Sequence, residues 1–205
     1  MCGLGGVIDP KSGLGPDRLR EIAQAMSRTL AHRGPDAEGF LIDPEAGLAF
    51  AHRRLSIVDL TPTGAQPMTS SDGRYVCIYN GEIYNFQDLR EELRAAGRRF
   101  RGTSDTEVFL EGCSEWGPER AIARLNGMFA IVLWDTRERR AILARDHLGI
   151  KPLYYAATPE RLWFASEMKA FRHCPGWRPE IEPDALAAYM RHGYVPGPGT
   201  IFRNV

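Results

Sequence analysis

The segment MFAIVLWD, residues 128–135, is an almost unbroken run of apolar side chains, and it indicates the fold class of this chain. Three further segments of strand composition follow it: RAILARD (140–146), PLYYAA (152–157) and RLWFAS (161–166). Two of the four are nearly continuous apolar runs, which is typical of strands that are covered on both faces. An antiparallel sheet pressed against a second sheet, with helices on its outer side, meets that requirement.

Three helices are expected ahead of this block of strands. Residues 16–30 carry apolar side chains at steps of three and four, which places them on one helical face, and Asp17 is the expected cap. NFQDLREELRAAG (85–97) predicts a second helix, which its last glycine ends. Ser104, followed three residues later by a glutamate, forms a capping box that starts a third helix over 104–116.

Short strands are expected at 1–8, 38–43, 47–58 and 74–80. The first of them, MCGLGGVI, holds three glycines, which mark a bulge or a place where another group approaches the backbone closely. It does not follow a strand and open a helix, as a dinucleotide-binding GxGxxG would. With helices early and strands clustered late, the pattern predicts an α+β fold.

Composition narrows the functional classes. The 205 residues are 43% apolar, and 26 basic side chains balance 26 acidic ones. The chain therefore has no net positive charge that would attract it to nucleic acid or to an anionic membrane. No apolar run is long enough to span a bilayer and no signal peptide is visible, so we expect a cytoplasmic protein. The four cysteines form no CxxC pair and the five histidines no HExxH motif, which predicts neither a disulfide framework nor a metal site.

Cys2 is the first candidate for chemistry. Removal of Met1 would leave one residue with both a thiol and a free α-amine. Such an amine has a pKa of about 7.7–8.0, so roughly a tenth of it is neutral at pH 7 and can act as a base toward the thiol. A cysteine at this position by chance is an equally good reading of the residue alone.

Other polar residues lie where expected strands meet turns or helices. Asn80 and Gly81 could donate to an oxyanion, although Asn-Gly is also the commonest hairpin turn, and the dipeptide alone favours the turn. Arg54 could bind a carboxylate through two parallel hydrogen bonds or lie on the surface. Asp105 could bind an ammonium group or complement its helix dipole, and Glu82 is open to the same two readings.

Taken together, a leading Cys-Gly, AHRGPDAEG, RRLSIVDL, GAQPM, YNGEIYN, SDTEV, LNGMFA, RDHLGIKPLYY and FASEMKA resemble the glutaminase domain of the asparagine synthetase family. That domain is a class II glutamine amidotransferase of the N-terminal nucleophile hydrolase type. The resemblance spans nearly the whole chain and implies a four-layer α-β-β-α sandwich of two antiparallel sheets.

The resemblance also implies roles for individual residues. Cys2 would be nucleophile and base, and Asn80 with Gly81 would form the oxyanion hole. The substrate would be L-glutamine, hydrolysed through a γ-glutamyl thioester to glutamate and ammonia without a metal or other cofactor. Its binding residues would be Arg54 for the α-carboxylate, Asp105 with Glu82 for the α-ammonium, and the backbone of Ile57 and Val58.

The resemblance divides the chain into a glutaminase domain, residues 2–180, and a linker with the start of a truncated synthetase domain, residues 181–205. The SGGxDS loop that binds ATP in that second domain does not occur here. ATP and Mg²⁺ are therefore expected only in a C-terminal synthetase domain of the same polypeptide, which would consume the ammonia. No nucleic acid or membrane partner is expected, and the oligomeric state is left open, with a homodimer as one option.

Two alternatives remain from the sequence. One is an N-terminal nucleophile acylase that cleaves another amide, against which Arg54, Asp105 and Glu82 argue. The other is a non-catalytic regulatory or assembly module that retains Met1.

Overall fold

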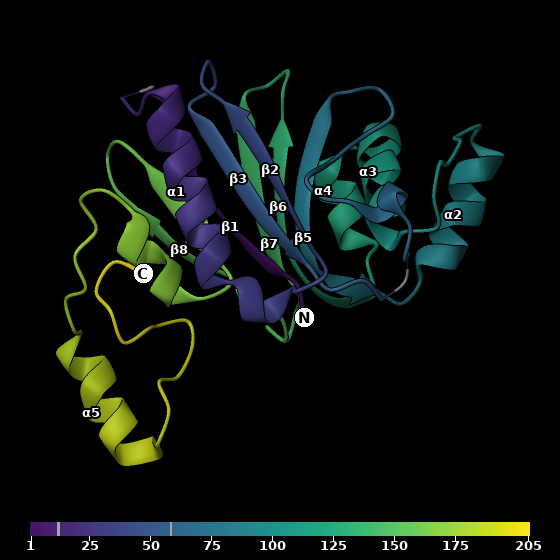
Figure 1. Ribbon diagram of the computed structural model, residues 1–205. Coiled ribbons are helices and arrows are strands. Elements are labelled where there is room, and N and C mark those ends of the chain that lie inside the picture. The colour runs from purple at the N-terminus through teal and green to yellow at the C-terminus, as the bar shows by residue number, and fades with distance from the viewer. Residues whose placement is uncertain (12, 58) are drawn as a thin grey trace.

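The computed structural model describes residues 1–11, 13–57 and 59–205, and the chain forms two antiparallel sheets (Figure 1). The first sheet has the strand order β2-β3-β1-β9-β8, and the second has the order β4-β5-β6-β7. The strands of the first sheet are β1 (Gly3–Ile8), β2 (Ala37–Asp43), β3 (Leu48–Arg54), β8 (Tyr154–Ala157) and β9 (Leu162–Ala165). Those of the second are β4 (Met68–Thr69), β5 (Tyr75–Ile83), β6 (Gly127–Asp135) and β7 (Arg140–Arg145).

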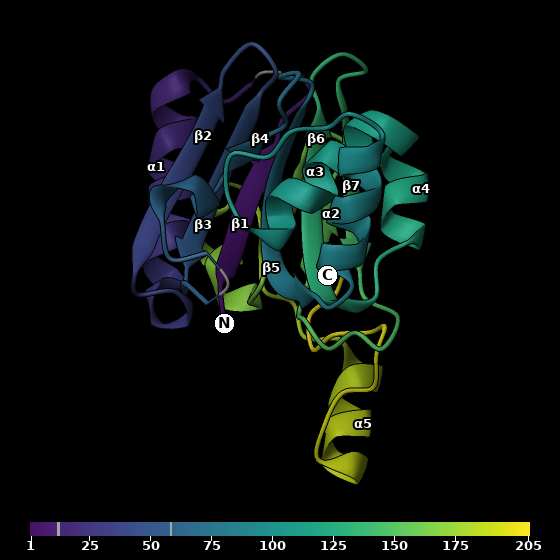
Figure 2. The same ribbon diagram turned by 90° about the vertical axis from the view of Figure 1, so that its right-hand side faces the viewer.

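Helices cover the outer face of each sheet, so the molecule has four layers in the order helix, sheet, sheet, helix (Figure 2). The first sheet is covered by α1 (Pro16–Thr29) and a 3-10 helix, Met168–His173. The second is covered by α2 (Phe86–Ala95), α3 (Asp105–Trp116) and α4 (Pro118–Ala123). Further 3-10 turns lie at Ala31–Arg33 and Pro62–Gly64. This arrangement is the α+β sandwich of two antiparallel sheets that the sequence predicts.

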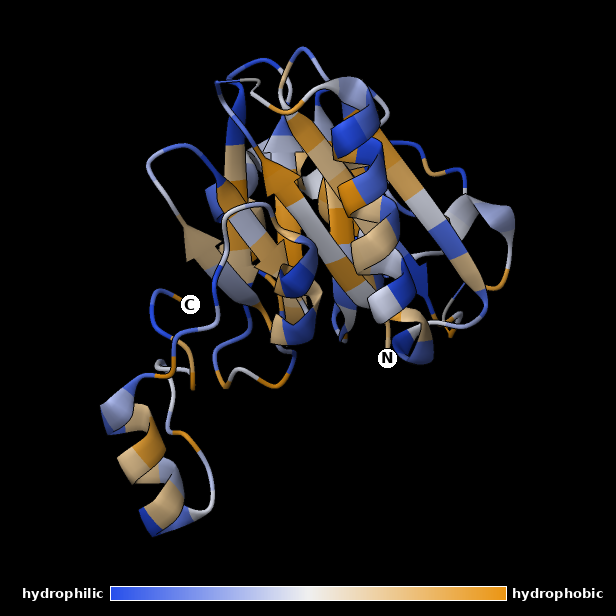
Figure 3. Cartoon of the chain, turned by 60° about the vertical axis from the view of Figure 1, so that its left-hand side comes forward, coloured by the Kyte–Doolittle hydropathy of each residue, from blue (hydrophilic) through white to orange (hydrophobic). Residues whose placement is uncertain are grey.

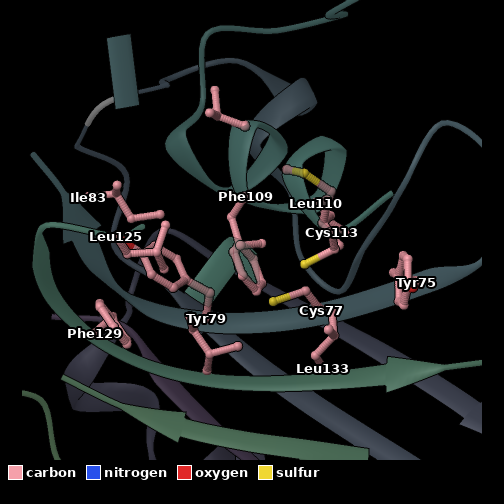
Figure 4. Close-up of a cluster of buried hydrophobic side chains, with 14 of the residues drawn as sticks. Tyr75, Cys77, Tyr79, Ile83, Phe109, Leu110, Cys113, Leu125, Phe129 and Leu133 are labelled. Atoms are coloured by element: carbon pink, nitrogen blue, oxygen red, sulfur yellow. The ribbon is translucent and has the colours of Figure 1, made fainter. Parts of the chain in front are cut away.

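Three apolar clusters fill the spaces between the layers. Leu4, Phe50, Ile78 and Val132 belong to the cluster between the two sheets. A second cluster joins α1 to the first sheet, and a third, shown in Figure 4, joins the helices to the second sheet. The strands are accordingly coloured mainly hydrophobic in Figure 3, whereas most loops are hydrophilic. Burying both faces of each sheet explains the continuous apolar runs in the sequence.

The glycines of β1 allow the close approach that the sequence predicts. β1 is a central strand, paired with β3 on one side and β9 on the other. A Cβ on Gly6 would overlap the Phe164 ring and the carbonyl oxygen of Ala49. Because β3 and β9 supply these atoms on either side of β1, only glycine fits at this position, and the strand begins directly after Cys2.

Several local predictions need correction. The strand expected over 47–58 ends at Arg54, whereas β5 continues past residue 80 to Ile83. Asp17 lies in the first turn of α1, whose cap is Gly15. The Ser104 cap is confirmed, since its hydroxyl accepts the backbone N–H of residue 107 at 3.1 Å.

The C-terminal part projects from the sandwich (Figure 1). It holds α5 (Pro183–His192), and Ile181 forms a bridge with Phe202. The Phe202 ring packs edge-on against Trp177 at 5.4 Å. The division at residue 180 stays a prediction. In the described residues, no helix has the length and apolar character needed to cross a membrane.

Candidate active site

Cys2 lies just before β1, where its side chain meets the chain that leaves β3. The Sγ atom accepts the backbone N–H of Leu55 at 3.3 Å and lies 3.5 Å from the Leu55 carbonyl oxygen. The carbonyl of Cys2 in turn accepts a hydrogen bond from Arg33 Nε at 3.0 Å. Backbone and side chain are thus both held, and the sulfur faces a pocket.

With Met1 still attached, the structure describes the unprocessed N-terminus. Burial raises the pKa of the Cys2 thiol and outweighs the opposing effects of the Leu55 hydrogen bond, the N-terminal charge and Arg54. Met1 also lines the pocket, and its sulfur lies 3.2 Å from Lys151 Nζ. In this form the thiol is protonated and the nitrogen of Cys2 is an amide, which cannot act as a base.

Asn80 and Gly81 lie inside β5, opposite Ala130 and Phe129 of β6. The hairpin turn favoured by the dipeptide alone is therefore wrong. Asn80 shares the strand face that looks toward the other sheet, since side chains alternate along a strand. Its Nδ2 is buried and has no hydrogen-bond partner among the described residues. A buried donor without a partner is costly, so this amide is available for a ligand atom in the pocket.

Arg54 is the last residue of β3, and a loop of carbonyl groups fixes its guanidinium. NH1 donates to the Thr61 carbonyl at 3.0 Å, and NH2 donates to the Asp59 carbonyl. The Asp59 carboxylate organises this loop by accepting hydrogen bonds from the backbone and hydroxyl of Thr61 and from the Thr63 hydroxyl. Burial raises the Asp59 pKa, but these bonds and one from Thr103 outweigh it and lower the pKa to about 2. The arginine is therefore held by the backbone of a loop that an ionised Asp59 carboxylate organises.

Asp105 opens α3 and is buried, with 5% of its surface exposed. Its Oδ2 accepts hydrogen bonds from the Tyr79 hydroxyl at 2.8 Å and from the Ile83 N–H at 3.0 Å. Burial is the largest influence and raises the Asp105 pKa, despite these bonds and one from Thr106 N–H to Oδ1 at 2.9 Å. A partly desolvated carboxylate of this kind is stabilised when a cation reaches it.

One pocket brings most of the predicted residues together. Of the eight, seven line it: Cys2, Arg54, Ile57, Asn80, Gly81, Glu82 and Asp105. Ile57 is two-thirds exposed, at 66%, and lies at the rim. The eighth, Val58, lies outside the described residues. Their proposed roles stay predictions, but the convergence of positions so far apart in sequence is a property of the fold.

The pocket also has lining residues that sequence reasoning missed. Tyr79 and Gln66 are among them, and Lys151, which is 6% exposed, also lines the pocket. Tyr79 gave no signal because an aromatic residue in an apolar strand reads as core. In the motif that contains Lys151, Arg145 and Asp146 order the loop by binding its backbone. Arg145 donates to two carbonyls of the loop, and Asp146 accepts three of its N–H groups and the N–H of Phe129 on β6.

Nothing in the described residues resembles a metal centre: no three His, Cys, Asp or Glu side chains are grouped closely enough. The pocket is lined by hydroxyl, amide and charged side chains, which suit an organic zwitterion. Around the Cys2 thiol it offers the Arg54 and Lys151 cations, the carboxylates of Asp59, Glu82 and Asp105, and the Asn80 amide donor.

Comparison with known proteins agrees with this geometry. Asparagine synthetase [glutamine-hydrolyzing] 1 of Bacillus subtilis is 40% identical over 205 residues, which cover all of this chain and 32% of that protein. Asparagine synthetase B [glutamine-hydrolyzing] of Escherichia coli is 44% identical over 171 residues, covering 83% of this chain and 30% of that protein. The chain thus spans about a third of the length of these relatives.

A solved structure supports the fold. Glutamine phosphoribosylpyrophosphate amidotransferase from B. subtilis superposes with a TM-score of 0.70 at 21% identity, covering 89% of this chain and 46% of the other. This similarity confirms the predicted sandwich. The family described as the glutamine amidotransferase domain matches residues 1–205. On the sequence match over its full length and the shared fold, the chain belongs to the family of glutamine amidotransferase domains.

Proposed function

We propose that this domain, after removal of Met1, hydrolyses the side-chain amide of L-glutamine to glutamate and ammonia through a thioester on Cys2. The observation that carries the proposal is the pocket itself. It sets the Cys2 sulfur beside the unpartnered amide of Asn80, with the fixed Arg54 cation and the buried Asp105 carboxylate in the same lining.

The charges of the pocket match those of a free amino acid. Arg54 is the group for the α-carboxylate, because a guanidinium binds both carboxylate oxygens at once. Asp105, with the half-buried Glu82, is the group for the α-ammonium. An N-acyl amide lacks that ammonium, so it would leave the buried carboxylate unpaired, and this disfavours the acylase alternative.

The chemical steps use groups of the chain alone. The freed α-amine of Cys2 takes the thiol proton as the sulfur attacks the side-chain carbonyl carbon. Asn80 Nδ2 and the Gly81 N–H donate to the oxygen that becomes negative in the tetrahedral intermediate. The protonated α-amine then gives its proton to the leaving nitrogen, so ammonia departs and a thioester remains. Water, deprotonated by the same amine, hydrolyses the thioester to glutamate and restores the thiol.

We further propose that the ammonia serves a synthetase domain of a longer polypeptide. The support is that both bacterial relatives are glutamine-hydrolysing asparagine synthetases, and each is about three times as long as this chain. Ammonia is mostly protonated in neutral water and then is not a nucleophile, so delivery within one protein preserves its reactivity. The acceptor, with its ATP and Mg²⁺, belongs to that second domain.

The test uses a preparation whose N-terminus has been sequenced. Glutamate and ammonia should appear in equal amounts from glutamine when Cys2 is the first residue, and N-acyl amides should not be cleaved. Cys2→Ala should abolish release, and so should a preparation that fully retains Met1. Normal turnover by either preparation would contradict the mechanism. Cleavage of N-acyl amides in preference to glutamine would favour the acylase.

A further inference from the structure

Strand β5 presents two adjacent side chains to opposite sides of its sheet. Asn80 faces the first sheet and the pocket, while Tyr79 points into the apolar cluster beneath the helices, among Phe109 and Phe129 (Figure 4). Tyr79 is 3% exposed, so its hydroxyl needs a partner inside the protein. That partner is the carboxylate assigned above to the substrate ammonium.

Contacts on both sides fix the Tyr79 hydroxyl against Asp105. The hydroxyl donates to Asp105 Oδ2 at 2.8 Å. The Tyr79 backbone N–H donates to Gln66 Oε1 at 2.6 Å, and its carbonyl accepts from His52 Nε2 at 3.0 Å. Gln66 also reaches the hydroxyl of Thr106, the residue after Asp105, at 3.4 Å. The position of the tyrosine relative to the first turn of α3 is therefore set on several sides.

The hydroxyl bond has a directional consequence for the carboxylate. Tyr79 and the Ile83 N–H both bind Oδ2, while Oδ1 is bound by the N–H of Thr106. A hydrogen bond to an ionised carboxylate is stronger than one between neutral groups and fixes its rotation. Without the hydroxyl, Oδ2 keeps one donor and the carboxylate remains buried.

We propose that Tyr79 is a positioning residue for the ammonium-binding carboxylate: its hydroxyl holds the Asp105 carboxylate aimed at the amino group of the substrate. The proposal rests on the proposed function, since it takes glutamine as the ligand. It makes Tyr79 a determinant of glutamine affinity and leaves the thiol chemistry to Cys2, Asn80 and Gly81.

Other charged and titratable groups lie near Asp105, and they also influence the pH dependence of glutamine binding. Arg54 and Cys2 line the same pocket, Glu82 lies on β5, and Cys77 lies beneath on the same strand. The Tyr79 hydroxyl lowers the Asp105 pKa against the larger effect of burial, which raises it. Loss of the Tyr79 hydroxyl should therefore raise the Asp105 pKa.

A matched pair of variants tests the proposal. Tyr79→Phe removes one oxygen, and Tyr75→Phe removes the same atom from the same strand and cluster. Within the described residues the Tyr75 hydroxyl forms no hydrogen bond to Asp105, and its ring lies under the Arg74 guanidinium, 4.9 Å from the centroid. Both changes go into a Met1-processed Cys2→Ala background, in which glutamine binding is measured by calorimetry without turnover.

Tyr79→Phe should weaken glutamine binding about tenfold or more, as expected for the loss of a hydrogen bond to a charged group. The pH below which binding fails should also rise, whereas Tyr75→Phe should change neither quantity. In the active enzyme, Tyr79→Phe should raise KM with kcat nearly unchanged.

Equal affinities and equal pH limits for the two variants would overturn the proposal, as would a fall in kcat at unchanged KM. Glutamine that binds to the Cys2→Ala protein but is not hydrolysed by the processed wild type would refute the proposed function while leaving the Tyr79 inference standing.

Discussion

The backbone N–H of Thr103 donates to Asp59 Oδ2 at 3.2 Å. This bond ties the loop that holds Arg54 to the segment that leads into Asp105 at the start of α3. The two charges proposed to hold the ends of the amino acid come from different layers of the sandwich. Asp59 links the two segments, because its backbone carbonyl accepts a hydrogen bond from Arg54 and its carboxylate accepts one from Thr103.

Asp59→Asn should therefore weaken glutamine binding without affecting the thiol. An amide offers one acceptor oxygen where the carboxylate offers two, and its NH₂ group would face backbone donors. We expect KM to rise about tenfold, equivalent to roughly 1.4 kcal/mol, with kcat little changed. The measurement is steady-state glutaminase kinetics on processed enzyme.

Asp72→Asn provides the control for this change. Asp72 also accepts a serine hydroxyl, that of Ser70, and a backbone N–H, that of Arg74, but it is not among the residues that line the pocket. Its replacement should leave KM unchanged. A KM for Asp59→Asn equal to that of the control would show that the Arg54 loop holds its position without this carboxylate.

Asn80→Ala should mainly lower kcat. The Nδ2 donor is unpartnered among the described residues, so its proposed partner is the oxygen that gains charge during attack. Removing one such donor costs about 10²–10³ in kcat. Asn85→Ala is the control, because Asn85 bonds to Arg124 and Asn126 of a neighbouring loop and does not line the pocket. A rise in KM alone for Asn80→Ala would place this amide in substrate binding instead.

The contrast between Asn80 and the apolar strands shows what the sequence could predict. Periodicity and continuous apolar runs predicted both sheets and the three main helices, because each pattern reports burial of its own segment. Asn-Gly alone favours a turn, yet residues 80 and 81 pair with β6 because the register of a long strand overrides a local preference. The residues alone offered the oxyanion role only as the weaker reading, and the resemblance to a family favoured it over the turn.

The contributions of Tyr79 and Asp59 could not be predicted for a different reason. Each acts through a contact between segments far apart in the chain: Tyr79 with Asp105, and Asp59 with Thr103. Composition and spacing carry no information on such pairs. An aromatic in a strand reads as core, and Tyr79 does belong to the core, while its hydroxyl alone reaches the pocket residue.

Gly81→Ala should destabilise the protein. A Cβ at this position would overlap the carbonyl oxygen of Met128 on the paired strand β6, and backbone cannot move aside as a flexible side chain can. We expect a loss of about 1–3 kcal/mol in the free energy of unfolding, measured by urea denaturation. Gly199→Ala is the control, since its Cβ would meet only the Pro196 carbonyl at an ordinary distance of 3.6 Å. Equal stability of the two variants would mean that β5 and β6 can separate locally at no cost.

His52 should make stability depend on pH. The side chain is 1% exposed between the sheets, and burial is the main influence that lowers its pKa from 6.5 to about 4, with a smaller contribution in the same direction from the Arg54 charge. Between those two values the unfolded chain binds a proton that the folded chain does not, so stability falls as the pH drops from about 6.5 to about 4. The loss attributable to this group is about 3 kcal/mol at most.

In His52→Asn the free energy of unfolding should vary less over this range, whereas replacing the exposed His192 on α5 by Asn should leave the wild-type dependence intact. Identical pH dependence in the wild type and His52→Asn would mean that the folded protein accepts the imidazolium, and that the bond from Nε2 to the Tyr79 carbonyl suffices to stabilise it.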